Sequence, residues 1–302
     1  MTKLTNVKAI AFSSLMAGLT ILLTVLSTFI IGTSLLSMIV LPLIASFVSL
    51  KVEFKYRFIY FFASLITFFF DPSLTLFIVI PSLISGIVLG SLISKYIQSY
   101  YIVFITTLVV SILQIGSTYL IDIIYQINMI ELFSNVLKID LHNFNSLFYF
   151  FIFTISLTQV CLSYTVISNE LKKLNIDFND KKNQFTNIYI INIISFIITM
   201  ITYFTSKPIY FLLLGFSIYF AVILAYYIFS YYQKKMMAVI QIPLYFICLF
   251  AYLILYSKLG ENSLILLPLP ILSQIITASY IIIFHKIIKK GQINESLFDN
   301  LN

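Results

Sequence analysis

The sequence predicts an all-α fold, a polytopic transmembrane helical bundle with about eight to ten membrane-spanning helices and both termini in the cytoplasm. Three observations support this prediction: the composition, the length of the apolar segments and the one-sided distribution of basic residues. Of the 302 residues, 61% are hydrophobic and 10% are charged, whereas a soluble domain carries roughly a quarter charged residues. The chain therefore has more apolar surface than a soluble fold can bury.

The apolar residues form ten segments, most of them long enough to cross a hydrocarbon core of about 30 Å. These segments are 9–30, 33–50, 58–70, 73–94, 101–125, 147–167, 188–204, 208–230, 237–256 and 263–284. The third is too short to span without tilting or thinning the bilayer, and we expect a kink or a re-entrant turn at the following Asp71-Pro72. The first is too long for an export signal and lacks a cleavage pattern, so we interpret it as a membrane helix.

The basic residues indicate the orientation. If every segment crosses the membrane, most of the 18 lysines and arginines face one side. Those on that side are Lys3, Lys8, Lys51, Lys55, Arg57, Lys95, Lys172, Lys173, Lys181, Lys182, Lys234, Lys235, Lys286, Lys289 and Lys290. Only Lys138, Lys207 and Lys258 face the other. Because basic loops stay in the cytoplasm, both termini are predicted there. The net charge of +7 thus marks topology, and no nucleic-acid partner is expected.

A polar face in the fifth segment is the first candidate for a ligand site. Ser111, Gln114, Thr118 and Asp122 are spaced by three or four residues, which places them on one side of a helix. With this topology Asp122 and Asp71 both lie toward the external surface, where they could line a cavity for a cationic or hydroxyl-rich ligand. The alternative is that the amide and hydroxyl groups bond to neighbouring helices, while Asp122 marks a helix end.

A second candidate lies in the last segment, where Gln274 and Thr277 follow Pro268 and Pro270. Helices broken near the membrane centre often expose backbone groups to a substrate, which makes Gln274 a candidate ligand residue. The alternative is a simple kink whose hydrogen bonds are repaired locally.

Small residues at four-residue steps form two further faces. One comprises Ser82, Gly86 and Gly90, and the other comprises Ala9, Ser13 and Ala17. Such faces let helix backbones approach closely, either within one chain or against a partner helix. Both possibilities remain open for both faces.

Catalytic motifs are missing from the sequence. His142 and His285 lie outside the apolar segments, and no HExxH, GxSxG or P-loop pattern occurs. Cys161 and Cys248 lie in apolar surroundings without a partner motif, which favours plain packing. We therefore expect no enzymatic activity, no metal and no cofactor, and we expect that any ATP hydrolysis comes from a separate protein. An intramembrane lipid-modifying enzyme is the least favoured alternative.

Residues 1–95 resemble a known family. The small-residue first helix, Leu41-Pro42-Leu43-Ile44-Ala45, Asp71-Pro72 and the helix from Pro81 to Gly90 resemble the YybS-like family of uncharacterised membrane proteins of low-GC Gram-positive bacteria. That family is distantly similar to the substrate-binding S components of energy-coupling-factor transporters. The resemblance implies that Ala9, Ser13 and Ala17 dock against a coupling membrane protein with separate ATPases.

Three regions are predicted on this basis. They are S-component-like helices in residues 1–95, the remaining transmembrane helices in 96–290 and a short polar cytoplasmic tail in 291–302. The predicted function is a small-molecule transport or ligand-binding component of the cell membrane, multi-pass and without its own ATPase. The alternative is a membrane scaffold or assembly factor for a partner complex.

Overall fold

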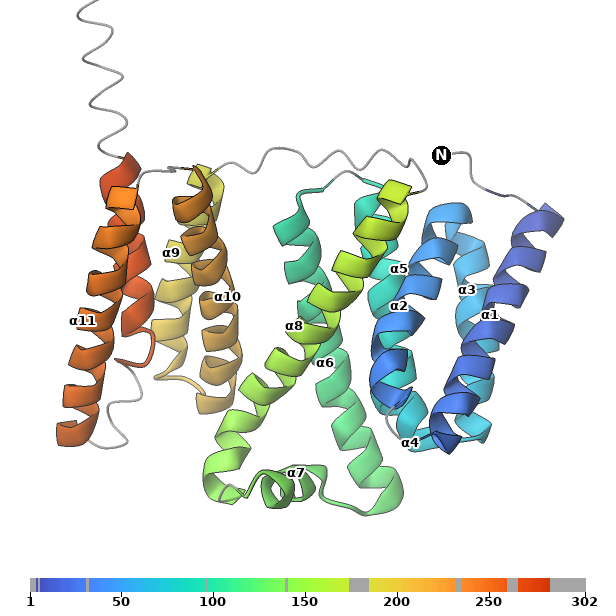
Figure 1. Cartoon of the computed structure of the whole chain (residues 1–302). Helices are drawn as coiled ribbons and strands as arrows, with labels where there is room; N and C mark the ends of the chain where they lie inside the picture. Colours follow the sequence, from blue (N-terminus) through green and yellow to red (C-terminus); the bar gives the residue numbers. More distant parts are fainter. Residues whose placement is uncertain are drawn as a thin grey trace, which may run out of the picture. The chain divides into compact units, whose positions relative to one another are not determined.

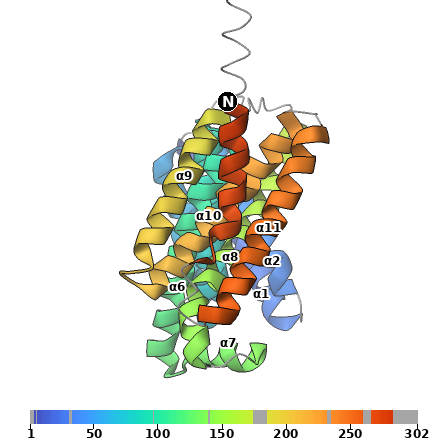
Figure 2. The ribbon, with the colours of Figure 1, turned by 90° about the vertical axis from the view of Figure 1, so that its left-hand side faces the viewer.

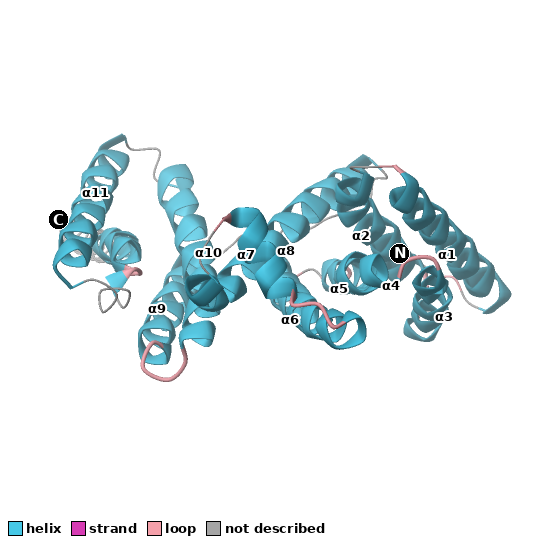
Figure 3. Ribbon diagram, turned by 90° about the horizontal axis from the view of Figure 1, so that it is seen from below, coloured by secondary structure: helices cyan, strands magenta, loops and turns pink. Residues whose placement is uncertain are grey.

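The structure of the chain is a computed structural model that describes residue 4 and residues 6–30, 33–95, 97–138, 141–173, 185–231, 235–259 and 266–282. Throughout these ranges every regular element is a helix (Figure 3). The predicted all-α membrane class is therefore confirmed. The chain forms two compact units, Met1–Lys182 and Asn183–Asn302, and the predicted tail 291–302 lies outside the described residues.

The described residues of unit 1 form eight α-helices, one short 3-10 helix and one short π-helix. They are α1 Asn6–Phe29, α2 Thr33–Lys51, α3 Phe54–Ser64, the 3-10 helix η1 Leu65–Phe69, α4 Pro72–Leu74, the π-helix η2 Thr75–Val79, α5 Ile80–Ile93, α6 Ser99–Tyr125, α7 Met129–Leu137 and α8 Leu141–Lys173. Figure 1 shows the amino ends of α1, α3 and α6 and the carboxyl ends of α2, α5 and α8 at one end of the unit. The connection carrying Lys51 and that carrying Lys95 lie at this end, which we call the basic end, and α7 lies at the opposite end.

Unit 2 contains α9 Phe185–Thr202, α10 Lys207–Tyr231, α11 Lys235–Leu259 and a further helix, Leu269–Ile282. These helices run side by side along their lengths (Figure 2). The hydroxyl of Ser217 on α10 lies 2.7 Å from those of Ser195 and Thr199 on α9. Tyr189 on α9 bonds to Ser279 of the last helix at 2.7 Å, so hydroxyl pairs join the helices of this unit.

Six helices in the described residues are long and apolar enough to cross a membrane, and Leu36–Lys51, Gln241–Leu255 and Leu269–Ile282 are shorter apolar helices. Each of the ten predicted segments contains helix, although the third is only α3 followed by η1. Large apolar side chains face outward, for example Val7, which is 78% exposed, and Ile123, which is 75% exposed. An exposed apolar surface on helices of this length is typical of segments that lie in lipid. With its six long apolar helices, the chain is an integral membrane protein.

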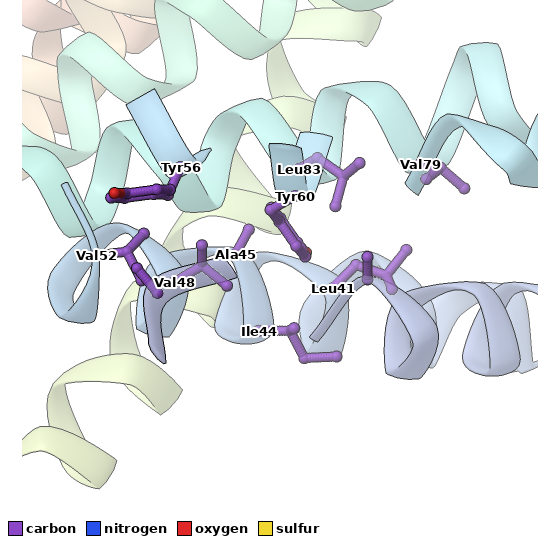
Figure 4. Close-up of a cluster of buried hydrophobic side chains, with 11 residues drawn as sticks. Leu41, Ile44, Ala45, Val48, Val52, Tyr56, Tyr60, Val79 and Leu83 are labelled. Carbon is purple, nitrogen blue, oxygen red and sulfur yellow. The ribbon is translucent and has the colours of Figure 1, made fainter. Parts of the chain in front are cut away.

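The core of unit 1 lies between α1, α2, α3 and α5. Figure 4 shows Leu41, Ala45, Tyr60 and Leu83 gathered in one cluster of buried side chains. The hydroxyl of Tyr60 is buried with the ring and lies 3.0 Å from the hydroxyl of Thr20 on α1. The apolar ring therefore fills the core while its polar tip has a partner, as the membrane interior requires.

Helices α2 and α5 are in backbone contact. A Cβ atom at Gly86 would meet the carbonyl oxygen of Pro42, and one at Gly90 would lie 2.6 Å from the carbonyl oxygen of Ser46. Only a residue without a side chain fits at these two positions. The hydroxyl of Ser49 completes the contact by donating to the carbonyl of Ile87 at 3.0 Å.

The π-helix η2 ends just before Pro81, which lies in the first turn of α5. In η2 the N–H of Ile80 bonds to the carbonyl of Thr75, so the next carbonyl, that of Leu76, would accept from residue 81. Proline has no N–H group, and the hydroxyl of Ser117 on α6 donates to Leu76 instead at 2.7 Å. The extra residue in this turn places Phe77 and Ile78 beside α6 and α7, where they line a cavity.

Helix α7 places Ile130, Phe133 and Leu137 at helical spacing. Aromatic contacts join α7 to its neighbours in unit 1. The ring of Phe133 on α7 lies 5.6 Å from that of Phe151 on α8 and 6.2 Å from that of Phe77 in η2. Figure 1 shows α7 lying across the bundle end between α6 and α8.

Gly86→Ala is expected to destabilise the protein by about 1–3 kcal/mol, because the added methyl group overpacks the contact with Pro42. Gly116→Ala is the matched control: this glycine is also helical but has no atom within 4 Å of an added Cβ. Thermal unfolding of both variants in one detergent measures the difference. Equal melting temperatures would show that the α2–α5 backbone contact is not tight.

Candidate functional site

Three helices of unit 1 are joined by a buried network of amides and hydroxyls. Ser156 on α8 donates to Oε1 of Gln114 on α6 at 2.7 Å, and Nε2 of Gln114 donates to Oε1 of Gln159 at 3.3 Å. Nε2 of Gln159 donates in turn to the hydroxyl of Ser82 on α5 at 2.9 Å. All four side chains are buried. The network therefore links α5, α6 and α8.

The network contains one predicted ligand residue, Gln114, which uses both ends of its amide to bond to α8. This is the helix–helix alternative considered for this face. Thr118, a second predicted ligand residue, instead donates to the backbone carbonyl of Gln114 on its own helix at 2.8 Å. Neither residue lines a described cavity.

The two aspartates occupy helix ends. Asp71 caps α4, because its Oδ1 accepts from the N–H of Leu74 at 2.9 Å and from the hydroxyl of Ser73 at 2.8 Å. Asp122 ties the end of α6 to α7 by accepting from the N–H of Met129 at 2.8 Å. In both carboxylates Oδ2 has no hydrogen-bond partner among the described residues, so part of each anion stays available.

A cavity of about 600 Å³ opens at this end of unit 1, a size typical of small-molecule sites. It is lined by Asp71, Ser73, Leu74, Phe77, Ile78, Ile121, Tyr125, Ile127 and Met129. Most of these side chains are apolar, and Asp71 is the one charged residue among them. Asp122 does not line the cavity but is bonded to Met129, which does. The site thus offers an apolar wall with one carboxylate at its margin.

Gln274 belongs to unit 2. Its Oε1 atom is buried without a hydrogen-bond partner in the described part of the chain, as are both amide atoms of Asn192 on α9. The neighbouring Thr277 donates back to the carbonyl of Ser273 at 2.8 Å, a local bond that satisfies its hydroxyl. Unit 2 therefore has buried amides with hydrogen-bonding capacity left over.

The six small residues considered for partner docking all lie inside unit 1. Ala9, Ser13 and Ala17 are buried, and the two alanines belong to the core cluster that α1 shares with α2 and α3. Ser82 lies in the amide network, and Gly86 and Gly90 contact α2. These faces are occupied by the chain's own helices.

Sequence reasoning missed one residue, Arg57 on α3. It was counted only with the basic loops, but its side chain is 7% exposed and donates to the hydroxyl of Ser91 at 2.5 Å and to the carbonyl of Ser49 at 2.7 Å. A signal existed: Arg57 is the single arginine, and the other basic residues are all lysines. Arginine stays charged when buried and offers five N–H donors in a fixed plane. A single arginine among lysines therefore indicates a position where these donors form specific hydrogen bonds.

Metal-ligand groups do not gather in the described residues, where no cluster of three or more His, Cys, Asp or Glu side chains is found. Cys161 and Cys248 are free thiols. His285 and the side chain of His142 lie outside the described part.

Comparisons of the chain with models of protein families, with curated proteins and with solved structures found no match.

Gln159→Leu is expected to destabilise unit 1 by about 1–3 kcal/mol, because it leaves the amide of Gln114 and the hydroxyl of Ser82 without their buried partner. Thr158→Val is the control on the same helix, since its exposed hydroxyl donates only to the carbonyl of Thr154. Denaturant titration in mixed micelles measures both. A loss no greater than that of Thr158→Val would show that the network contributes little.

Proposed function

We propose that this membrane protein binds a small amphiphilic molecule, carrying a cationic or hydroxyl group, in the cavity beside Asp71. One observation carries the proposal: a carboxylate with a free oxygen lies at the margin of a cavity of about 600 Å³ whose other walls are mainly apolar. An apolar body would lie against Phe77, Ile78 and Ile121, while its polar group donates to Asp71. Pockets with mainly apolar walls and a few polar groups are typical ligand sites.

The cavity is proposed to face the outside of the cell membrane. It lies at the end of unit 1 that carries α7, whereas the connections with Lys51 and Lys95 lie at the basic end (Figure 1). Since basic loops stay in the cytoplasm, this arrangement supports cytoplasmic termini and capture of the ligand from the external side.

Transport is the extension that the resemblance to S components implies, with a coupling membrane protein and its ATPases as partner. Docking through Ala9, Ser13 and Ala17 would require these buried residues to leave the core. A partner would instead contact the outer side of α1, where Val7, Leu15 and Leu22 are exposed.

Asp71→Asn tests the ligand site. The amide oxygen of asparagine still caps α4, because Asn and Asp are nearly equal as N-caps, so the substitution removes the charge and keeps the fold. We expect the occupancy of a bound small molecule, measured by native mass spectrometry after mild-detergent purification, to fall by about tenfold, corresponding to about 1.4 kcal/mol.

Asp122→Asn is the matched control for this experiment. It removes the same charge at the same end of unit 1 and keeps an acceptor for the N–H of Met129, but Asp122 does not line the cavity. The occupancy of the bound small molecule in this variant should stay within about twofold of that in the original protein. Equal retention in all three proteins would refute the site. A stable protein partner without any small molecule would support the scaffold alternative instead.

A further inference from the structure

Arg57 is a buried cation without a counter-anion. Its side chain is 7% exposed, and the described residues contain only two ion pairs, Lys55 with Glu53 and Lys173 with Glu170. Both hydrogen-bond acceptors of Arg57 are neutral: the hydroxyl of Ser91 and the carbonyl of Ser49. A buried charge normally has an oppositely charged partner, because desolvation otherwise opposes its burial.

The guanidinium also has unused donors. Of its five N–H groups, two bond to Ser91 and Ser49, and the buried Nε has no partner. The ring of Phe54 lies 5.9 Å from the guanidinium carbon and stabilises the cation from one side. A π face does not accept the remaining hydrogen bonds, so the group still lacks an anionic acceptor.

An apolar groove of about 230 Å³ adjoins this cation. It is formed by Phe54, Arg57, Phe58 and Phe61 of α3 and by Ile84 and Ile87 of α5. Phe54 and Phe58 are exposed at the surface of unit 1, where the chain's apolar helices meet lipid. Five of the six lining side chains are apolar, which suits a hydrocarbon chain.

The position of the groove indicates the membrane depth. Arg57 lies in the first turn of α3, two residues after Lys55, and the amino end of α3 lies at the basic end of unit 1 (Figure 1). By the positive-inside rule this end meets the headgroups of the cytoplasmic leaflet, where anionic lipids are concentrated. A cation without a counter-anion and an apolar groove therefore lie side by side at this end of unit 1.

We propose that the groove between α3 and α5 binds one anionic phospholipid, whose phosphate accepts hydrogen bonds from Arg57 and whose acyl chain lies on Phe58, Phe61, Ile84 and Ile87. This site is separate from the cavity beside Asp71, which lies beyond the other end of α3 and η1. The lipid would hold α3 against α5 by bridging their side chains. The proposal does not depend on the function proposed above.

The test is native mass spectrometry of the full chain in mild detergent, titrated with phosphatidylglycerol or with phosphatidylcholine of the same acyl chains. We expect one phosphatidylglycerol to remain bound with a preference of about tenfold. Arg57→Gln should reduce this preference to within about twofold. Lys55→Gln removes a charge from an exposed neighbour already paired with Glu53 at 3.6 Å, and it should keep the preference.

Ile84→Trp keeps Arg57 but fills the groove, and it should lower the retention of phosphatidylglycerol even if Arg57→Gln does not fold. The proposal would be overturned by equal binding of both lipids by the original protein, by equal losses for Lys55→Gln and Arg57→Gln, or by full retention by Ile84→Trp. Displacement of the lipid by inorganic phosphate would also overturn it, because the site would then be one for a free anion.

Discussion

The close approach of α2 and α5 is the contact on which the rest of unit 1 depends. Gly86 and Gly90 bring the α5 backbone against the carbonyl oxygens of Pro42 and Ser46. Since lipid gives no hydrophobic drive for helix association, van der Waals packing between smooth surfaces must hold such helices together. With this pair in place, α1 and α3 cover its core cluster and Arg57 finds its acceptors on both helices.

Many buried polar groups in unit 1 bond to side chains of neighbouring helices or locally to the same helix, whereas the hydroxyls of Ser13, Thr75, Thr107 and Ser163 and the Nε of Arg57 have no partner in the described part of the chain. The amide network joins α5, α6 and α8, and Ser117 replaces the N–H that Pro81 lacks. These bonds are required because the hydrocarbon core supplies no water. The carboxylates of Asp71 and Asp122 are instead at helix ends. The proposed ligand site beside Asp71 therefore lies away from the middle of the bundle.

The sequence predicted the positions of the helices better than the contacts between them. The composition and the ten apolar segments predicted the helical membrane class, and Asp71-Pro72 correctly marked a break between helices. Helical spacing identified the face of Gln114 and Thr118 but could not show that Gln159 and Ser82 meet it. Spacing defines which residues share a face, whereas neighbours depend on packing that is not local in sequence.

The same limit applies to Arg57 and to the π-helix. The position of Arg57 beside lysines resembled an ordinary basic loop, and only the contact of α3 with α2 and α5 buries it. The sequence analysis treated 73–94 as one uninterrupted segment and did not predict the π turn, where Ser117 of the next helix donates to the carbonyl of Leu76. The proposed ligand cavity likewise depends on where η2 and α7 meet.

The burial of Arg57 has a consequence for the order of membrane insertion. Helix α3 has 11 residues and contains both Lys55 and Arg57, so it is a poor independent span for the translocon. Its acceptor Ser91 lies on α5, 34 positions further along the chain, so the hydrogen bonds that accompany the burial of Arg57 are complete only when α5 is also in place. The amino-terminal third of the protein is therefore expected to assemble as a group of helices rather than one helix at a time.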